Sequence, residues 1–350
     1  MKRNVRVALY GVGVIGSLAA KFLLEKKGVE IIGAIDVAKD KVGRDLGDII
    51  GVNKRLGIAI SNDVDAVLSR TKPDIVVHTT SSFLEKVYLQ IEEIVNYGVN
   101  VVSTCEELSY PFLSSPKLAR ELDEIAKKHD ATILGTGINP GFLMDTLVIA
   151  LTAPCEKIEQ IKVIRVMNAA TRRVPFQKKI GAGLTVADFE DKMRNKTISG
   201  HVGLEQSIAM VANALAWELE KIQIDSAEPV VAQKDVRSEA ISVKVGQVAG
   251  LRQCGFGIRS KEKAISLEFE AYIGAEEEYD AVTIEGVPPI REKISPCVHG
   301  DIGTIAMICN AIPKVINADP GLLTMKDLPI PSAAVEDMRE YVKLEGEQHA

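Results

Sequence analysis

The sequence predicts a two-domain α/β protein, in which a doubly wound parallel sheet is followed by an α+β domain with a mixed or antiparallel sheet. Two observations predict this order. Short apolar segments alternate with helical patterns through about the first 150 residues, which is the rhythm of βαβ units. From residue 157 onward apolar and polar residues alternate instead, as they do in strands that expose one face. A chain of 350 residues is long enough to build a core in each domain.

The change in pattern places three segments along the chain. We expect residues 1–150 to form the parallel-sheet domain and residues 151–300 the α+β domain. Residues 301–350 should form a helical segment that packs back on the first domain, although the polar tail after Lys343 is not expected to pack. The expected strands are 5–10, 30–35, 58–60, 75–77, 99–104, 131–134, 157–168, 241–245, 265–273 and 282–284, the clearest helices are 15–23, 204–222 and 305–316, and 248–257 is expected to be a connection.

The first strand runs directly into a glycine-rich loop and then into a helix. Gly11 permits a tight turn, and Gly13 allows backbone amides to approach a pyrophosphate. Gly16 allows the helix to pack closely against the strand. Val14 and Ile15 are the first residues of this helix, whose unpaired amides and partial positive charge suit phosphate groups.

The end of the second strand completes the pattern. Asp36 lies about 20 residues beyond the last glycine of the loop, where a carboxylate accepts hydrogen bonds from an adenosine ribose. The sequence therefore predicts a Rossmann-type domain that binds NAD or NADP, and Asp36 favours NAD. Arg44 is near enough in the chain to meet a 2′-phosphate, with a solvated arginine as the alternative.

Polar residues follow the next strand as well. Thr79 and Thr80 come directly after the strand 75–77 and its His78, at the edge where open α/β sheets collect ligands, so we expect both threonines to contact the cofactor. Ser82 and Glu85 have the spacing of a capping box for the helix that follows.

Glu106 and Glu107 follow the strand 99–104 and are the strongest candidates for catalysis. Hydride removal from a carbon that bears an amine creates an iminium cation. A fixed carboxylate beside that carbon stabilises the cation, orients the amine and helps water to attack. The alternative is that both acids are solvated, or that one of them caps a turn.

Further candidates lie in loops. The segment 135–141 is dense in glycine and proline, and its Asn139 is placed to meet the nicotinamide or the substrate. Arginine can hold a substrate carboxylate through paired hydrogen bonds, and histidines in glycine-flanked loops titrate near neutral pH. The residues of these two kinds are Arg172, Arg173, Arg252, His201 and His299, each of which has an ordinary surface or structural role as its alternative.

Composition excludes several classes of function. The net charge is −6 and no basic stripe is present, so nucleic acids and anionic membranes are poor partners. No apolar stretch is long enough for a membrane span. The five cysteines lack the spacing of a metal site, which favours a reducing cytoplasm and no metal.

The open face of the second sheet must be covered by other parts of the protein, and the second subunit of a homodimer would cover it.

These motifs resemble the 2,4-diaminopentanoate dehydrogenases and the related native amine dehydrogenases, whose nucleotide-binding domain is similar to that of dihydrodipicolinate reductase. The resemblance covers nearly the whole chain and is carried by segments 11–16, 101–111, 135–142, 200–204, 246–250 and 299–304. Dihydrodipicolinate reductases carry a paired-histidine motif, and no such pair occurs here. Homoserine dehydrogenases have Asn-Lys where this chain has Cys105-Glu106.

The resemblance implies oxidative deamination of 2,4-diaminopentanoate by NAD(P)+ to 2-amino-4-oxopentanoate and ammonia, reversible as reductive amination. It also implies that a glutamate after the strand ending in Ser-Thr handles the amine. Glu106 matches that residue, with Glu107 as the alternative. Among the loop candidates chosen above from the residues themselves, Asn139, Arg172 and His299 are the ones expected to bind the substrate. Two other functions stay open: a dehydrogenase of another amino acid or a semialdehyde, and a dinucleotide-sensing protein without catalysis.

Overall fold

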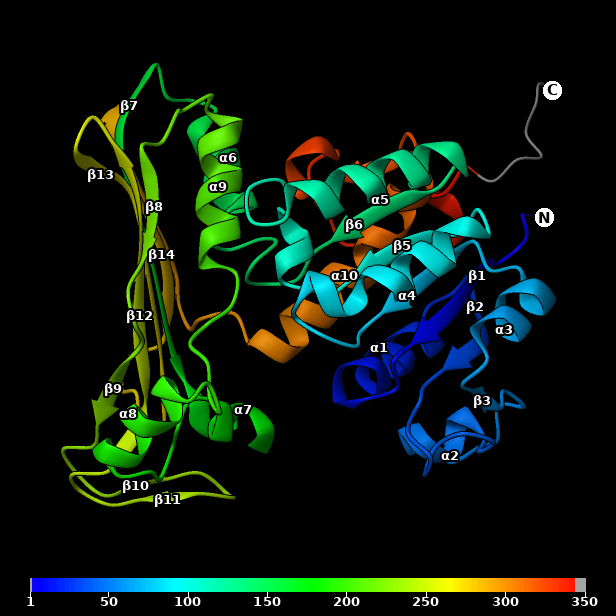
Figure 1. The fold of residues 1–350 in the computed structure, drawn as a ribbon, viewed down its shortest axis with the longest axis horizontal. Helices are drawn as coiled ribbons and strands as arrows, with labels where there is room; N and C mark the ends of the chain where they lie inside the picture. The colour runs from blue at the N-terminus through cyan, green and yellow to red at the C-terminus, as the bar shows by residue number, and fades with distance from the viewer. Residues whose placement is uncertain (1, 344–350) are drawn as a thin grey trace. The chain divides into compact units, whose positions relative to one another are not determined.

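The computed structural model describes residues 2–343, which form two compact units (Figure 1). Unit 1 contains the chain up to Phe142 together with the chain from Asp301 onward, and unit 2 contains Leu143–Gly300. The first unit ends before the expected boundary at 150, because α6 (Thr146–Thr152) contacts α9 (Leu204–Ala214) within unit 2. The tail after Lys343 lies outside the described residues.

Unit 1 is built on the doubly wound parallel sheet that the sequence predicts. Its strand order is β16-β6-β5-β4-β1-β2-β3, and every pairing is parallel. The order reverses between β1 and β4, and in sheets of this kind ligands bind outside the carboxyl ends of the strands at that point. The bounds are β1 Val5–Tyr10, β2 Val29–Ile35, β3 Ile60–Ser61, β4 Ile75–His78, β5 Asn100–Ser103, β6 Thr132–Gly135 and β16 Gly321–Leu323.

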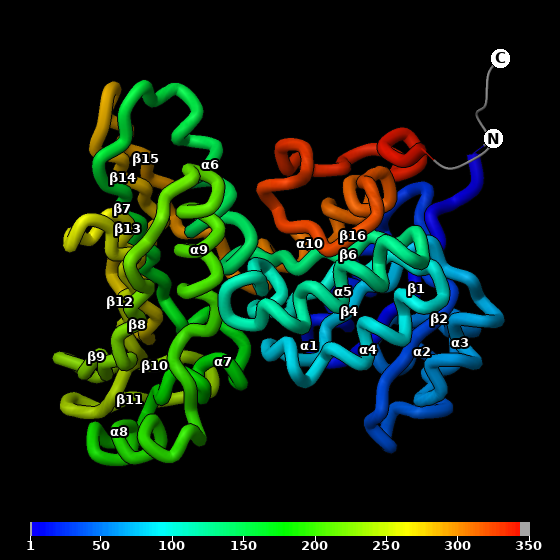
Figure 2. Tube along the Cα trace, turned by 45° about the horizontal axis from the view of Figure 1, so that its top comes forward, coloured from blue at the N-terminus to red at the C-terminus, as the bar shows by residue number. Residues whose placement is uncertain are grey.

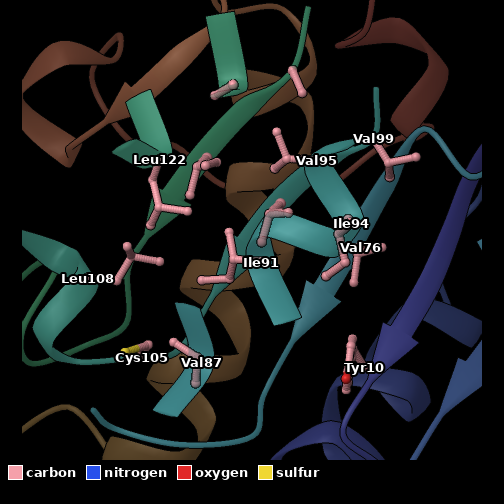
Figure 3. Packing of buried hydrophobic residues seen from close by; sticks show 14 of the residues in the cluster. Tyr10, Val76, Val87, Ile91, Ile94, Val95, Val99, Cys105, Leu108 and Leu122 are labelled. Carbon is pink, nitrogen blue, oxygen red and sulfur yellow. The ribbon is translucent and has the colours of Figure 1, made fainter. Parts of the chain in front are cut away.

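Helices cover both faces of this sheet (Figure 2). Helix α4 shows why they do so, because Val87, Ile91, Ile94 and Val95 recur at helical spacing and are fully buried beside Val76 of β4 (Figure 3). Each such side chain contributes roughly 1.5–3 kcal/mol on burial. The bounds are α1 Val14–Leu24, α2 Leu46–Ile50, α3 Val64–Thr71, α4 Leu84–Asn96, α5 Pro116–Lys128 and α10 Gly300–Ile316.

Unit 2 contains the mixed sheet that the sequence predicts. Its order is β15-β14-β7-β13-β12-β8, with β9 also paired to β12, and β7 and β13 are parallel while the other neighbours are antiparallel. Figures 1 and 2 show α6 and α9 side by side along one face of it. The strands are β7 Lys157–Asn168, β8 Lys221–Ile224, β9 Glu228–Val231, β12 Val248–Arg259, β13 Glu262–Tyr272, β14 Tyr279–Val287 and β15 Ile290–Ile294, with a separate ribbon of β10 Val236–Arg237 and β11 Ser242–Val243.

The largest difference from expectation is β12, a central strand that the sequence predicts as a connection. The cause is its glycines. A Cβ on Gly255 or Gly257 would come within 3.0 Å of Ile208 on α9, so these positions lack side chains because the helix lies close against the strand. Glycine is normally unfavourable in a strand, but here its small size allows α9 to approach β12 closely.

The helical segments of unit 2 also differ from expectation. Helix α9 ends at Ala214, not near residue 222, because Ala216 adopts a left-handed φ of 52° and the chain then enters β8. Two short helices that are not expected from the sequence, α7 (Val174–Lys179) and α8 (Val186–Arg194), follow β7. Among the described residues no helix is long and apolar enough to cross a membrane.

Candidate active site

The glycine loop after β1 has one open position between two tightly packed ones. Gly11 has a φ of 92°, and a Cβ there would come within 2.7 Å of the carbonyl oxygen of Thr79. A Cβ on Gly16 would overlap the carbonyl oxygen of Gly11. Around Gly13, by contrast, no atom lies within 4 Å of an added Cβ. The loop therefore fits a dinucleotide, because the position that faces the pyrophosphate in this motif is the one with open space.

Helix α1 begins directly behind this loop. Gly13 is its N-cap and makes no side-chain capping hydrogen bond, and Val14 and Ile15 are the first two helical residues. Their amides are thus at the positive end of the helix dipole, without a serine or aspartate side chain at the N-cap. This is the arrangement that binds phosphate at helix N-termini.

Asp36 lies at the end of β2 and is tied to the loop. Its Oδ2 accepts a hydrogen bond from the amide of Val12 at 2.8 Å and one from Lys41 Nζ at 2.9 Å, and its Oδ1 accepts one from the amide of Ala38 at 2.9 Å. Burial opposes the charge on Asp36, but the hydrogen bonds from Ala38, Lys41 and Val12 hold its pKa below the usual value. Asp36 is therefore a carboxylate at the edge where the sequence places the ribose.

The two threonines after β4 use their hydroxyls inside the protein. Thr79 Oγ1 donates to the carbonyl of Gly11 at 2.8 Å, which braces the glycine loop. Thr80 Oγ1 donates to Gln90 Oε1 on α4 at 2.7 Å. Both are thus at the expected edge of the sheet, but their side chains support the loops there.

His78, the last residue of β4, is fully buried in the same network. Its Nε2 lies 2.8 Å from Gln90 Oε1 and its Nδ1 lies 2.9 Å from Ser103 Oγ. A neutral ring that donates from Nε2 and accepts at Nδ1 satisfies both partners. Burial lowers the pKa of His78 to about 4. Ser103 Oγ in turn accepts a hydrogen bond from the amide of Cys105 at 3.1 Å. Cys105 directly precedes Glu106 and Glu107 in the chain, so this network adjoins the two glutamates.

The two adjacent glutamates have different surroundings. Glu107 Oε2 accepts a hydrogen bond from the amide of Leu84 at 2.7 Å, and the amide of Glu107 donates to the carbonyl of Ser82 at 3.2 Å. Glu107 is therefore the cap of α4. The capping box expected from Ser82 and Glu85 is wrong, because the N-cap is Phe83 and the capping carboxylate comes from a residue farther along the chain.

Glu106 is half-buried and is the N-cap of the short helix η1 (Glu107–Ser109). Its carbonyl accepts hydrogen bonds from the amide and the hydroxyl of Ser109, which fix the backbone at this position. Gly135, at the end of β6, allows η1 to pass, because a Cβ there would overlap the backbone of Leu108. The neighbouring Cys105 is not a nucleophile, since burial raises the pKa of its thiol to about 12.

Asn139 lies half-buried in the loop after β6, the strand beside β5. The loop starts with a hydrogen bond from the amide of Thr136 to the carbonyl of Ser103 at 2.9 Å, so it is tied to the strand that leads to Glu106. Unit 1 thus gathers the glycine loop, Asp36, both threonines, both glutamates and Asn139 at the carboxyl edge of one sheet.

Arg172 and His299 belong to unit 2 and lie together there. The Arg172 guanidinium stacks over the ring of Phe176, 4.3 Å from its centroid, and a Cβ on Gly300 would overlap that guanidinium. His299, next to Gly300, has Nε2 3.5 Å from the carbonyl oxygen of Thr171. The two residues chosen from distant parts of the sequence are therefore neighbours.

Comparison with known proteins now decides the family. Residues 142–344 match the profile of the 2,4-diaminopentanoate dehydrogenase C-terminal domain, and residues 5–108 match that of the dihydrodipicolinate reductase N-terminus. The chain is 38% identical to 2,4-diaminopentanoate dehydrogenase of Acetoanaerobium sticklandii over 348 residues, which cover 98% of each chain. The chain belongs to the 2,4-diaminopentanoate dehydrogenase family.

Two further relatives bear the name amine dehydrogenase. The sequence is 24% identical to the enzyme of Streptomyces virginiae, over 93% of this chain and 96% of that one. The solved structure of amine dehydrogenase from Mycobacterium smegmatis superposes with a TM-score of 0.83 at 30% identity, covering 95% of this chain and 98% of that one. The protein is thus an oxidoreductase that acts on amines, with the NAD(P)-binding fold of its family.

In this member of the diaminopentanoate dehydrogenase family, Arg165 is a residue that sequence reasoning missed. It points inward from β7, is almost fully buried, and donates to Asp280 Oδ1 at 2.7 Å and to the carbonyl of Val298 at 2.6 Å. It therefore holds the backbone that precedes His299. The alternation of Ile161 and Val163 along the strand could have identified Arg165 as an inward-facing residue.

The remaining candidates have structural partners. Arg252, considered from the sequence as a carboxylate ligand, is paired with Glu268 and with Glu270 across β12 and β13. His201 stacks on Phe269 with ring centroids 4.3 Å apart, and burial and then nearby positive charges lower its pKa to about 3. Arg173 is the N-cap of α7. Residues 2–343 contain no cluster of three metal-binding side chains.

Proposed function

We propose that the protein oxidises 2,4-diaminopentanoate at its 4-amino carbon, giving 2-amino-4-oxopentanoate. The balanced reaction consumes the ammonium form of the substrate, NAD(P)+ and water, and releases the ketone, ammonium, NAD(P)H and a proton. The observation that carries the proposal is that the two adjacent glutamates have different surroundings. Glu107 is engaged as the cap of α4, so the carboxylate assigned to the amine is that of Glu106. The name of the 38% identical relative supports the substrate.

Glu106 would act on both steps of the chemistry. The ammonium group first releases a proton to solvent, and NAD(P)+, when bound, accepts the hydride from the carbon that bears the resulting neutral amine. The Glu106 carboxylate stabilises the iminium cation that this removal leaves, and it then accepts a proton from the water that attacks the cation. The fixed backbone of Glu106, held by Ser109, supports this role because catalysis by a charge requires the charge to be in place before the reaction.

The cofactor would lie along the carboxyl edge of the parallel sheet. We assign its pyrophosphate to Gly11, Gly13 and the amides of Val14, Ile15 and Gly16, and its adenosine ribose to Asp36. Thr79 and Thr80 shape the adjacent wall through the contacts of their side chains. The Asp36 carboxylate supports a preference for NAD+, because a 2′-phosphate would meet a like charge there.

The substrate's own charged groups indicate the remaining roles. Arg172 and His299 would bind the carboxylate, and Asn139 would orient the amine-bearing end. The Arg172 guanidinium lies over the ring of Phe176, and this supports the first assignment because stacking orients the plane of the guanidinium.

We further propose a homodimer in the cytoplasm. On the face of the second sheet opposite α9, apolar residues such as Ile164, Phe256 and Tyr272 are half-buried in one chain, and a second copy would cover them. The described cysteines are all free thiols, as in proteins of a reducing compartment. Light scattering should therefore give the mass of two chains.

The test is nicotinamide reduction in the presence of candidate amines. With NAD+, 2,4-diaminopentanoate should give an increase in NADH absorbance and a stoichiometric amount of ammonium. 4-Aminopentanoate retains the reacting centre and should react slowly, whereas 2-aminopentanoate lacks it and should not react. Reduction with 2-aminopentanoate alone would favour an ordinary amino-acid dehydrogenase. Binding of NAD+ without reduction by any short diamine or amino acid would favour the sensing function.

A further inference from the structure

A lysine occupies the place beside Asp36 where a second charge would alter cofactor choice. Lys41 Nζ lies 2.9 Å from Asp36 Oδ2, and the two side chains are only 22% and 10% exposed. The pair is therefore largely sheltered from solvent, where an ion pair is stronger than on an open surface. The sequence gives Asp36 as a lone acid, but the structure makes it half of a neutral pair.

The backbone around Lys41 forms a fixed turn. The amide of Lys41 donates to the carbonyl of Ala38 at 2.9 Å, and this turn returns the lysine toward Asp36. Gly43 then donates to the carbonyl of Ile60 at 2.8 Å, which joins the end of the turn to β3. The segment after Asp36 is thus held at both ends, and the position of Lys41 follows from the backbone.

Arg44, the residue considered from the sequence for a 2′-phosphate, is placed differently. It is exposed, and its guanidinium donates to the carbonyl of Asp40 at 3.4 Å. Residues 37–44 carry three cations, Lys39, Lys41 and Arg44, and of these Lys41 is the one with a hydrogen bond to Asp36. Arg44 is consequently a matched control: it has the same sign of charge on the same turn and lacks that contact.

We propose that Lys41 allows the ribose site to accept NADP+ as well as NAD+, by leaving Asp36 to pair with the 2′-phosphate. A carboxylate alone at this position repels a phosphate dianion, and a basic residue nearby is what accommodates it in NADP-binding relatives of the fold. With NAD+, Lys41 stays on Asp36 and the ribose hydroxyl binds the same carboxylate. The inference rests on the proposed function for the site, and it names the residue that sets the ratio of the two affinities.

Binding without turnover tests this directly. Dissociation constants for NAD+ and NADP+ would be measured by calorimetry on the full chain in the absence of amine, for the wild type, Lys41→Met and Arg44→Met. We expect the wild type to bind both dinucleotides. Lys41→Met should raise the dissociation constant for NADP+ by about tenfold or more, which is the scale of one charge-assisted hydrogen bond. The dissociation constant for NAD+ should stay within about threefold of the wild-type value. Arg44→Met should leave the ratio of the two affinities within about twofold.

Adenosine 2′,5′-bisphosphate and AMP give a second comparison that does not involve the nicotinamide. The preference for the bisphosphate should fall in Lys41→Met, and the salt dependence of bisphosphate binding should fall with it. An unchanged NADP+ to NAD+ ratio in Lys41→Met, or an equal loss in Arg44→Met, would overturn the assignment of Lys41. Failure of the wild type to bind either dinucleotide would instead overturn the proposed function, so the two failures are distinguishable.

Discussion

The carboxylate of Glu107 accepts a hydrogen bond from the amide of Leu84 at 2.7 Å, 23 residues earlier in the chain. This contact ties the loop after β5 to the first turn of α4, whose N-terminal amides would otherwise lack a side-chain cap. The same contact separates two acids that are adjacent in sequence. One stabilises a helix, and the other remains the candidate for catalysis.

Glu106→Gln and Glu107→Gln should therefore fail in different ways. Glu106→Gln removes the charge that stabilises the iminium cation, so we expect kcat to fall by about a hundredfold or more. Glu107→Gln weakens the cap of α4, so we expect a loss of about 1 kcal/mol in the free energy of unfolding and a much smaller effect on kcat. Steady-state kinetics and urea denaturation of both variants measure these quantities.

Two outcomes with these variants would contradict the roles assigned to Glu106 and Glu107. If Glu107→Gln lost more activity than Glu106→Gln at equal stability, the roles of the two residues would be reversed. Equal and full activity in both variants would show that neither carboxylate handles the amine. NAD+ affinity should be unchanged in both, which excludes loss of the cofactor as the cause of a lower rate.

Gly13→Ala and Gly16→Ala separate cofactor binding from folding. Gly13 has an extended conformation at φ −79° and open space around it, so alanine should leave the melting temperature unchanged while its methyl group weakens NAD+ binding by roughly tenfold. At Gly16 the added Cβ would overlap the carbonyl of Gly11, so we expect a loss of at least about 2 kcal/mol in stability. Thermal unfolding and dinucleotide titration distinguish the two, and full NAD+ affinity in Gly13→Ala would place the pyrophosphate elsewhere.

Much of this fold could be predicted because its signals are local. The strands at 5–10 and 157–168 coincide with β1 and β7, since apolar character and alternation are properties of the segment itself. The strand β12 could not be predicted, because the glycines at 255 and 257 are explained only by the packing of α9 against the strand. For the same reason Glu107 as a cap and the buried His78 could not be predicted, because they depend on contacts between distant segments. The pairing of Lys41 with Asp36 depends on the turn between them, which hydrophobic periodicity does not indicate.

Arg172 should matter for substrates with a carboxylate. We expect Arg172→Met to raise KM for 2,4-diaminopentanoate by about tenfold or more, because it removes a charge-assisted hydrogen bond, with little change in kcat. An amine without a carboxylate should be oxidised equally well by the variant and the wild type. Lys178→Met, which removes one exposed positive charge from α7, is the matched control and should behave as the wild type does. A tenfold rise in KM for both kinds of amine would indicate a packing role for Arg172.

His78 should make the protein sensitive to acid. Its pKa is about 4 in the folded protein against 6.5 when exposed, because it is buried, so below pH 6.5 the unfolded chain binds the proton more readily. Its contribution is therefore fully present above pH 6.5 and is lost as the pH falls toward 4. Between pH 7.5 and pH 5 this costs about 2 kcal/mol. His78→Gln should reduce that pH dependence whatever its own stability at pH 7.5, as urea unfolding at the two pH values would show, and an unchanged difference would assign the acid sensitivity to other groups.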